Sequence, residues 1–488
     1  MKVLYLPLDS RPCNYRFPVQ LLNMAGHDCL VPAPDQMDYF RKPSHHAAIR
    51  DFLLENAAHA DALILSVDQL AYGSLLASRD THVSTEEALD RLQLVRTLRQ
   101  AYPSLLIVAY GVILRSSIST LRTQDIAWHN LITEYSQAAH RAALSALPQD
   151  QAELQRITTL LPQEMRDAYH QVRERNQTVN RHCIDFLREG TFDRLLLLQE
   201  DSQPLGFHRM EQDALRARMA DVSGTGKIAL HNGTDEGGCL CAASLAQHPL
   251  KLYVETLGRP SCNFIAKYED RPFDENIRSS CAFAGIELTT WDEADKVLLV
   301  LPPDTEPQQD VLAADTSYSV ADAMRVGRLA DRVVDKLRRG KPVGLLDVRY
   351  ANGGAMRFME TLARRCDVLS LSAYAAWNTA SNALGTILAQ LQLGQDGQAN
   401  QAFTLERLLD DLIYQSRVRS QLRTALAALG EDVLSLKDKQ RAEQHLNTLM
   451  EQAVQSSPLF RERQIQARYA LPWPRIFEAS VTAGGRPL

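Results

Sequence analysis

The 488-residue chain is predicted to be an α/β protein built on parallel strands. Short apolar runs alternate with amphipathic segments, which is the pattern of repeated strand–helix–strand units. Several of these runs end in turns that carry acidic or amide side chains. Seven candidate strands in the first half fit a (β/α)8-like barrel or a doubly wound parallel sheet, and we favour the barrel.

The first half is predicted to form one barrel-like domain over residues 1–260. The stretch 119–190 is rich in charge, Ala, Leu and Gln, which predicts one long solvent-facing helix or a hairpin of two. Apolar runs bounded by turn residues give the candidate strands 3–8, 28–32, 62–67, 105–110, 194–199, 228–231 and 251–256.

The second half is predicted to hold a smaller α/β domain over 261–400 and a helical C-terminal region over 401–488. Helical periodicity covers 405–429 and 433–454 in the C-terminal region. No internal repeat is visible. The candidate strands of the α/β domain are 264–268, 287–291, 296–301, 343–347 and 368–373.

Composition limits the partners of the chain. Hydrophobic residues make up 45% and charged residues 23%, which is typical of a soluble globular protein. The net charge of −6 argues against an extended phosphate-binding surface, so we expect no nucleic-acid partner. No apolar stretch is long enough to cross a bilayer and no signal peptide is visible, so we expect a cytoplasmic protein without a membrane partner. The oligomeric state is left open.

The motifs of several cofactor and metal classes do not occur in the sequence. We find no G-x-G-x-x-G, no P-loop, no H-E-x-x-H and no G-x-S-x-G pattern. The eight cysteines are scattered, and the single close pair, Cys239 and Cys241, lacks the spacing of a zinc ribbon. We therefore expect reduced thiols, no cofactor and no structural metal.

The most informative stretch is the acidic pair Glu200 and Asp201, which directly follows the buried strand candidate 194–199. Polar side chains just past the carboxyl end of such a strand face the ligand crevice in α/β folds. If the two carboxyl groups converge, one pKa should rise toward a value useful for proton donation. The alternative is a turn that caps the helix expected near His208.

A second acidic pair, Asp235 and Glu236, follows the strand candidate 228–231 and is flanked by glycines on both sides. The glycines allow a tight turn and a close approach of the backbone to a ligand. A helix that starts here with Asp235 as its N-cap explains part of the pattern, and both interpretations can hold together. We take both acidic pairs as candidate catalytic carboxylates.

Two further strand ends carry candidate substrate-binding residues. Asp9, Arg11 and Asn14 follow the first strand, where the arginine either pairs with Asp9 in a structural ion pair or grips an anionic group bidentately. Asp68 follows the strand candidate 62–67 and is assigned to a pocket wall rather than a simple turn.

The second half adds a candidate sugar-binding group. Trp377 stands among small residues, and Asn378 and Asn382 are four apart, which would place both amides on one helix face. A tryptophan presents a flat apolar face to a sugar ring, and amides bind hydroxyl groups. Asn352 follows the strand candidate 343–347 and joins this group. The alternative is a tryptophan packed at a helix start with Asn378 as the cap.

Three motifs together resemble a bacterial family known only as a domain of unknown function. They are P-L-D-S-R-P-C-N from residue 7, N-G-T-D-E from residue 232 and Y-A-A-W-N-T from residue 374. The resemblance covers most of the chain and implies that the motifs act as one set, but it implies no reaction. The adjacent acids are also similar to those of barrel hexosaminidases that use substrate-assisted catalysis, a likeness of geometry alone.

These residues lead to three hypotheses about function. The first is a glycoside hydrolase in which one carboxyl group of a pair protonates the leaving oxygen and a neighbour orients the reacting group, with a sugar as the small-molecule substrate. The second is a metal-dependent hydrolase in which acids of the strand ends hold a divalent cation. The third is a non-catalytic protein that binds a small polar ligand. The metal hypothesis rests on Asp9, Asp68, Asp201 and Asp235.

Overall fold

The fold comes from a computed structural model, which describes residues 1–145, 147–314, 319–395, 397–461 and 463–483. The chain divides into two compact units. The first unit contains Met1–Cys241 and Tyr268–Asp270, and the second contains Ala242–Lys267 and Arg271–Leu488. Apart from Tyr268–Asp270, the first unit ends at Cys241, and the C-terminal helical region lies in the second unit.

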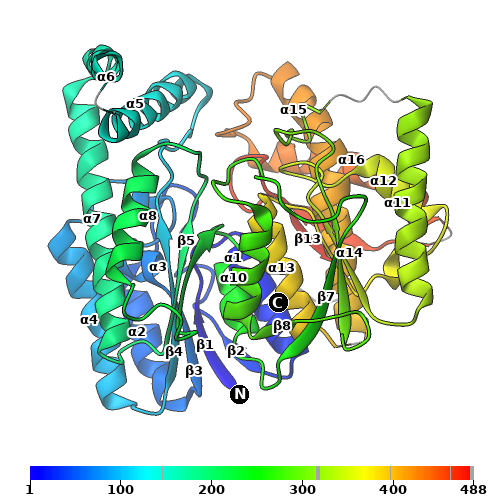
Figure 1. The fold of residues 1–488 in the computed structure, drawn as a ribbon, viewed down its shortest axis with the longest axis horizontal. Coiled ribbons are helices and arrows are strands. Elements are labelled where there is room, and N and C mark those ends of the chain that lie inside the picture. The colour runs from blue at the N-terminus through cyan, green and yellow to red at the C-terminus, as the bar shows by residue number, and fades with distance from the viewer. Residues whose placement is uncertain (146, 315–318, 396, 462, 484–488) are drawn as a thin grey trace. The chain divides into compact units, whose positions relative to one another are not determined.

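The first unit is built on an open sheet of six parallel strands (Figure 1). The order is β2-β1-β3-β4-β5-β6, so the chain moves from β1 to one side and then reverses to the other. The described strands form an open parallel sheet and no closed barrel, so the favoured barrel does not form there. The strands are β1 (Lys2–Leu6), β2 (Asp28–Leu30), β3 (Ala62–Ser66), β4 (Leu106–Ile113), β5 (Arg194–Gln199) and β6 (Ile228–Asn232).

Most helices of the first unit cover one face of this sheet. Alternate strand residues such as Leu63, Leu65 and Leu197 form a single buried core with apolar residues of α2, α4, α7 and α8. The connection from β1 to β2 runs through α1, which therefore lies on the opposite face in a right-handed doubly wound sheet. The helices are α1 (Pro12–Met24), α2 (His46–Asn56), α3 (Val67–Tyr72), α4 (Thr85–Ala101), α5 (Ile126–Leu144), α6 (Pro148–Leu160), α7 (Gln163–Arg188) and α8 (Phe207–Arg218).

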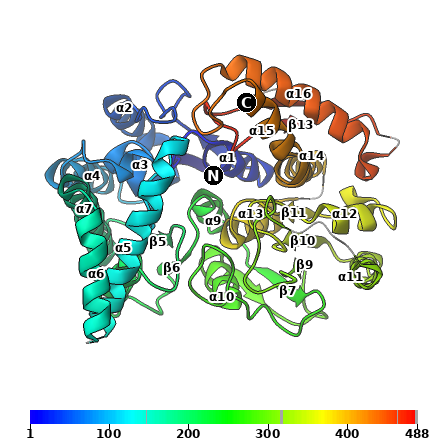
Figure 2. The same ribbon diagram turned by 90° about the horizontal axis from the view of Figure 1, so that it is seen from above.

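The stretch 119–190 forms three helices, α5, α6 and α7, where the sequence predicts one or two. Pro148 occupies the first turn of α6, and Pro162 is the N-cap of α7. Proline lacks the backbone N–H that a continuing helix needs, so each proline starts a new helix instead of extending the previous one. In both ribbon views α5 and α6 lie side by side (Figures 1 and 2).

The second unit contains an open sheet of five parallel strands, in the order β11-β10-β9-β7-β8. Its first strand lies between its second and third, as in the first unit, so the two units share one strand order although the sequence shows no repeat. The predicted strand 264–268 does not form; Ile265 makes only an isolated bridge to Pro272. The strands are β7 (Leu250–Thr256), β8 (Ile286–Leu288), β9 (Lys296–Leu301), β10 (Val343–Asp347) and β11 (Ala373–Ala375).

The C-terminal region shares a core with the second sheet. Leu299 of β9 and Leu345 of β10 are buried together with Phe358, Leu412 and Leu446 from the surrounding helices. Between α14 and α15 the chain continues as a π-helix over Leu408–Val418. The other elements of the second unit are α10 (Phe273–Ala284), α11 (Val320–Arg338), α12 (Met356–Ala363), α13 (Ala380–Leu393), α14 (Gln398–Arg407), α15 (Arg419–Ala428), α16 (Lys439–Gln455), β12 (Ala467–Ala470) and β13 (Ser480–Ala483). Helix α9 (Gly237–Ala243) begins in the first unit and ends in the second.

Two properties of the described residues bear on the environment of the protein. Within them, no helix combines the length and the apolar character that crossing a bilayer requires. All eight cysteines are free thiols.

Candidate active site

The carboxyl edge of the first sheet carries the candidate active site. In an open doubly wound sheet the ligand crevice lies where the strand order reverses, which here is between β1 and β3. Asp9 follows β1, and Asp68 lies in α3 directly after β3. Glu200 follows β5 and Asp235 follows β6. The acids predicted for the first half of the chain therefore lie on one edge of one sheet.

Arg11 holds Asp9 and Asp235 together in a buried ion network. Its Nη2 donates to Asp9 Oδ2 at 2.7 Å and to Asp235 Oδ1 at 2.5 Å, and its Nη1 donates to Asp235 Oδ2 at 3.1 Å. Asn14 Nδ2 donates to Asp9 Oδ1 at 3.0 Å and to Asp235 Oδ1 at 3.2 Å. All four residues are at least 95% buried. One guanidinium thus neutralises carboxylates that are more than 200 residues apart in the chain.

The neighbour of Asp235, Glu236, is in a different state. Its Oε2 accepts the backbone N–H of Thr234 at 2.8 Å, whereas its Oε1 is buried without a hydrogen-bond partner. Burial raises the pKa of Glu236 to about 8, and the charges of Asp235 and Glu269 act in the same direction. A pKa raised to this value favours the protonated form of Glu236 at neutral pH.

Gly233 makes room for this carboxyl group. The residue has a φ of +123°, and a Cβ at this position would overlap Glu236 Oε1. We expect Gly233→Ala to destabilise the fold by about 2–4 kcal/mol, because backbone strain adds to the displaced carboxyl group. Chemical denaturation measures the loss. The matched control is Gly26→Ala, with a φ of +78° and nothing within 4 Å of the added Cβ, for which we expect about 1–2 kcal/mol. Equal losses for both variants would contradict the packing of Glu236 against Gly233.

Two arginines hold the other acidic pair. Arg79, in the 3-10 turn Ala77–Arg79, donates to Glu200 Oε1, and the backbone N–H of Arg115 donates to Glu200 Oε2 at 3.2 Å. Arg115 Nη1 donates to Asp201 Oδ2 at 3.3 Å. Burial lowers the pKa of Arg79 to about 10, and the neighbouring Arg115 adds to the shift. Glu200 is thus held by Arg79 and by the backbone of Arg115. The Asp201 side chain, in contrast, is 38% exposed to solvent.

The predicted rise in the pKa of one acid of this pair falls on Asp201. Desolvation and the charge of Glu200 raise the pKa of Asp201, against the opposing charge of Arg115. Asp68 lies close enough to respond to Glu200 as well. Burial raises the pKa of Asp68 to about 7, opposed by the Val112 N–H, which donates to Asp68 Oδ2 at 2.9 Å.

Three charged residues of this edge were missed by sequence reasoning. Arg115 directly follows the apolar run of β4, so the strand-end pattern could have found it. Asp38 accepts the Ser10 N–H at 2.8 Å, and burial together with Asp9 raises the pKa of Asp38. Asp38 lies in an irregular segment and Arg79 at the end of a three-residue 3-10 turn, and neither is marked by a periodic pattern as part of a site.

The predicted sugar-binding residues Asn352, Trp377, Asn378 and Asn382 belong to the second unit. Helix α13 starts at Ala380 with Thr379 as its N-cap, so Asn378 precedes the helix. The predicted shared helix face of Asn378 and Asn382 was therefore wrong, because the cap falls one residue later. Asn352 does lie beside Asn378: its backbone N–H donates to the Asn378 carbonyl at 2.7 Å.

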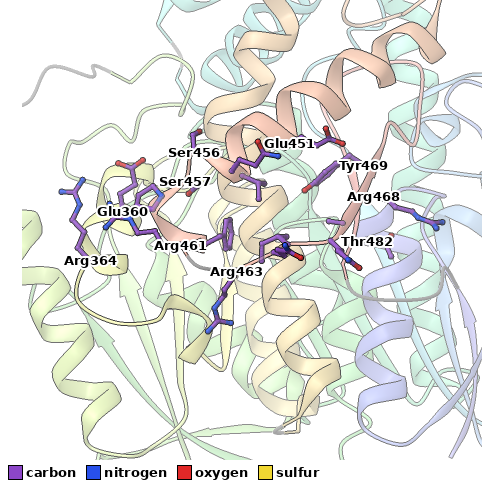
Figure 3. Close-up of a pocket in the computed structure, with 18 residues that line it drawn as sticks. Glu360, Arg364, Glu451, Ser456, Ser457, Arg461, Arg463, Arg468, Tyr469 and Thr482 are labelled. Carbon is purple, nitrogen blue, oxygen red and sulfur yellow. The ribbon is translucent and has the colours of Figure 1, made fainter.

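A large open pocket lies elsewhere in the second unit. It has a volume of about 1390 Å³ and is bordered by residues of α12, α16, β12 and β13 (Figure 3). The labelled side chains in Figure 3 include Arg461, Arg463 and Glu451, and none of the predicted site residues lines this pocket. The buried acids do not line this pocket. We assign the candidate site to the acids because strongly shifted pKa values cluster at functional sites.

Metal binding finds little support in the arrangement of the side chains. In the parts of the chain that the structure describes, no three His, Cys, Asp or Glu side chains are grouped so that they could hold a metal ion. Asp9 and Asp235, two of the four ligands of the metal hypothesis, already share Arg11. Asp201 pairs with Arg115.

The fold and the site define a two-unit α/β protein with open parallel sheets of six and five strands and a buried carboxyl cluster at one sheet edge. The chain belongs to the family described as "Protein of unknown function (DUF4127)", whose model matches residues 3–482. This confirms the family resemblance. Searches of curated proteins and of solved structures gave no significant match.

Proposed function

We propose that this protein is a carbohydrate-active hydrolase of the glycosidase type, with its catalytic centre at the carboxyl edge of the first sheet. The observation that carries the proposal is the state of Glu236. A buried carboxyl group with a pKa of about 8 and an unpartnered Oε1 is a proton donor at neutral pH. The carboxylate of its sequence neighbour Asp235 pairs with the Arg11 guanidinium. We therefore assign the proton donor to Glu236 and the carboxylate to Asp235.

This division of roles matches what glycoside cleavage requires. One carboxylic acid protonates the leaving oxygen, while a carboxylate stabilises the positive charge that develops on the sugar. Glu236 would transfer its proton to the glycosidic oxygen as the bond from that oxygen to the anomeric carbon breaks. A water molecule would then bond to the anomeric carbon and return one proton to Glu236, so that the acid is restored.

The geometry favours Glu236 over Glu200 as the acid. Glu200 accepts from the Arg79 side chain and from the backbone N–H of Arg115, so both of its carboxylate oxygens already have donors. Within the described residues no cationic side chain pairs with Glu236, and its Oε2 accepts one backbone N–H. Glu200 and Asp201 would then shape and orient the site through Arg79 and Arg115. Asp68, with a pKa of about 7, is available for proton exchange near neutral pH.

A screen of aryl glycosides tests the proposal. We expect release of the aryl alcohol from at least one sugar class, with a rate that falls as the pH rises through about 8, because Glu236 loses its proton there. The reaction should persist after treatment with a chelator. Ligand binding without release across the whole panel would favour the non-catalytic alternative, and chelator-sensitive release would favour the metal-dependent one.

A further inference from the structure

The second unit contains a cluster of buried polar atoms that lack hydrogen-bond partners. Four residues make up this cluster, which we call the second-unit polar cluster: Asn352, Trp377, Gln415 and Arg419. The atoms are Asn352 Oδ1, Trp377 Nε1, Gln415 Oε1 and Arg419 Nε. Each residue is at most 7% exposed. A buried polar atom that lacks a hydrogen-bond partner destabilises the fold, so four of them call for an explanation.

Ring contacts, hydrogen bonds and one charge interaction connect these four residues into one neighbourhood. The Trp377 ring lies 5.9 Å from the ring of Phe477, and the Arg419 guanidinium lies over the same Phe477 ring at 5.4 Å. Gln415 Nε2 donates to the Phe477 carbonyl at 3.2 Å. Asn352 joins through Asp310, whose Oδ2 accepts from Asn352 Nδ2 at 2.6 Å and whose charge acts on Arg419.

The chemical identity of the unpartnered atoms is well defined. Asn352 and Gln415 each donate through the amide nitrogen to an oxygen, a carboxylate in one case and a carbonyl in the other, so both amide oxygens are free acceptors. Trp377 Nε1 and Arg419 Nε are donors only. The cluster therefore offers two acceptors and two donors, and the negative charge of Asp310 acts on Arg419.

This pattern selects a class of ligand. A hydroxyl group donates one hydrogen bond and accepts others, so a molecule with several hydroxyl groups satisfies mixed donors and acceptors at once. The rings of Trp377 and Phe477 supply an apolar surface for the C–H face of such a molecule. We propose that the second unit binds a small neutral ligand rich in hydroxyl groups, such as a monosaccharide or polyol, at the second-unit polar cluster.

The location agrees with the fold of the unit. Asn352 follows β10 and Trp377 follows β11, so both stand at the carboxyl edge of the parallel sheet, where ligands bind in doubly wound folds. Arg419 opens α15, and Gln415 belongs to the π-helical segment before it. Helical segments of this wide form are frequent at functional sites. The proposal does not depend on Glu236, so it goes beyond the proposed hydrolase activity.

Calorimetric titration of the full chain with glucose, N-acetylglucosamine and glycerol tests this inference. We expect at least one of these probes to bind, with about tenfold weaker binding to Trp377→Phe, which removes one donor and keeps an aromatic ring. Asn352→Gly should weaken binding as well, and glycine accepts the φ of +64° at this position. The matched control is Trp291→Phe, a partly exposed tryptophan of the same unit outside the cluster.

The outcomes separate this site from the proposed catalytic centre. Binding that persists in Glu236→Gln while hydrolysis is lost supports a ligand site of its own in the second unit. Binding that is equal in Trp377→Phe and in the native protein overturns the inference. It is also overturned if none of the three probes binds and a high-resolution structure shows ordered waters on all four atoms.

Discussion

Glu236→Gln is expected to lower the rate of hydrolysis by a factor of about 10²–10⁴ while the fold stays intact. The substitution removes the proton that we assign to the leaving oxygen, and general acid catalysis contributes about this factor. Glutamine has the size of the protonated acid and is neutral like it, so the packing around Gly233 and Thr234 is kept. Initial rates on the best substrate of the screen, with far-UV circular dichroism as a check of folding, measure the effect.

The stability of the same variant provides a test that needs no substrate. The pKa of Glu236 is raised in the folded protein, so the unfolded state loses its proton first as the pH rises. Native stability should therefore fall between the ordinary glutamate pKa of about 4.5 and about 8. Glu236→Gln should lack this fall and be the more stable form above pH 8 or so. Parallel stability curves for the two proteins across this range would contradict a raised pKa.

Arg11→Met is expected to destabilise the fold by about 3–5 kcal/mol. The substitution leaves the carboxylates of Asp9 and Asp235 buried without their counter-charge, which costs far more than the net value of the ion network itself. Denaturant unfolding at neutral pH measures the loss.

Two further variants make the result for Arg11 specific. Arg11→Lys keeps the charge but cannot bridge both carboxylates through a planar fork, so we expect an intermediate loss that can be measured even if Arg11→Met fails to fold. Arg188→Met removes an exposed arginine of the same unit that pairs with Asp185 and Asp221, and should change stability by less than about 1 kcal/mol. A loss for Arg11→Met no larger than that for Arg188→Met would contradict the role of Arg11.

Strands with strong apolar runs could be predicted from the sequence to the residue. The strands over 194–199, 296–301 and 343–347 form as expected because each run is buried and ends at a turn. The strand order could not be predicted. The strand order depends on β2 and β3 lying on opposite sides of β1. Contacts between residues far apart in the sequence determine this placement, and local patterns do not predict it.

For the candidate site, too, the sequence predicted the residues that follow strands but not the contacts between distant parts of the chain. Asp9 and Asp235 were found because each follows a buried strand, and parallel strands bring their carboxyl ends to one edge. Their shared partner Arg11 was proposed to pair with Asp9, but the bridge to Asp235 spans 224 residues and has no local signal. The distinction between Glu200 and Glu236 was also out of reach, because it depends on Arg79 and on burial.

The most direct test of the central claim is the protonation state of Glu236, followed by infrared difference spectroscopy between the native protein and Glu236→Gln. We predict a carbonyl band of a neutral carboxyl group in the native protein at neutral pH, absent from the variant and lost with a pKa of about 8. Loss of that band near the ordinary glutamate pKa of about 4.5 would show that Glu236 is charged at neutral pH, and the assignment of the proton donor would be wrong.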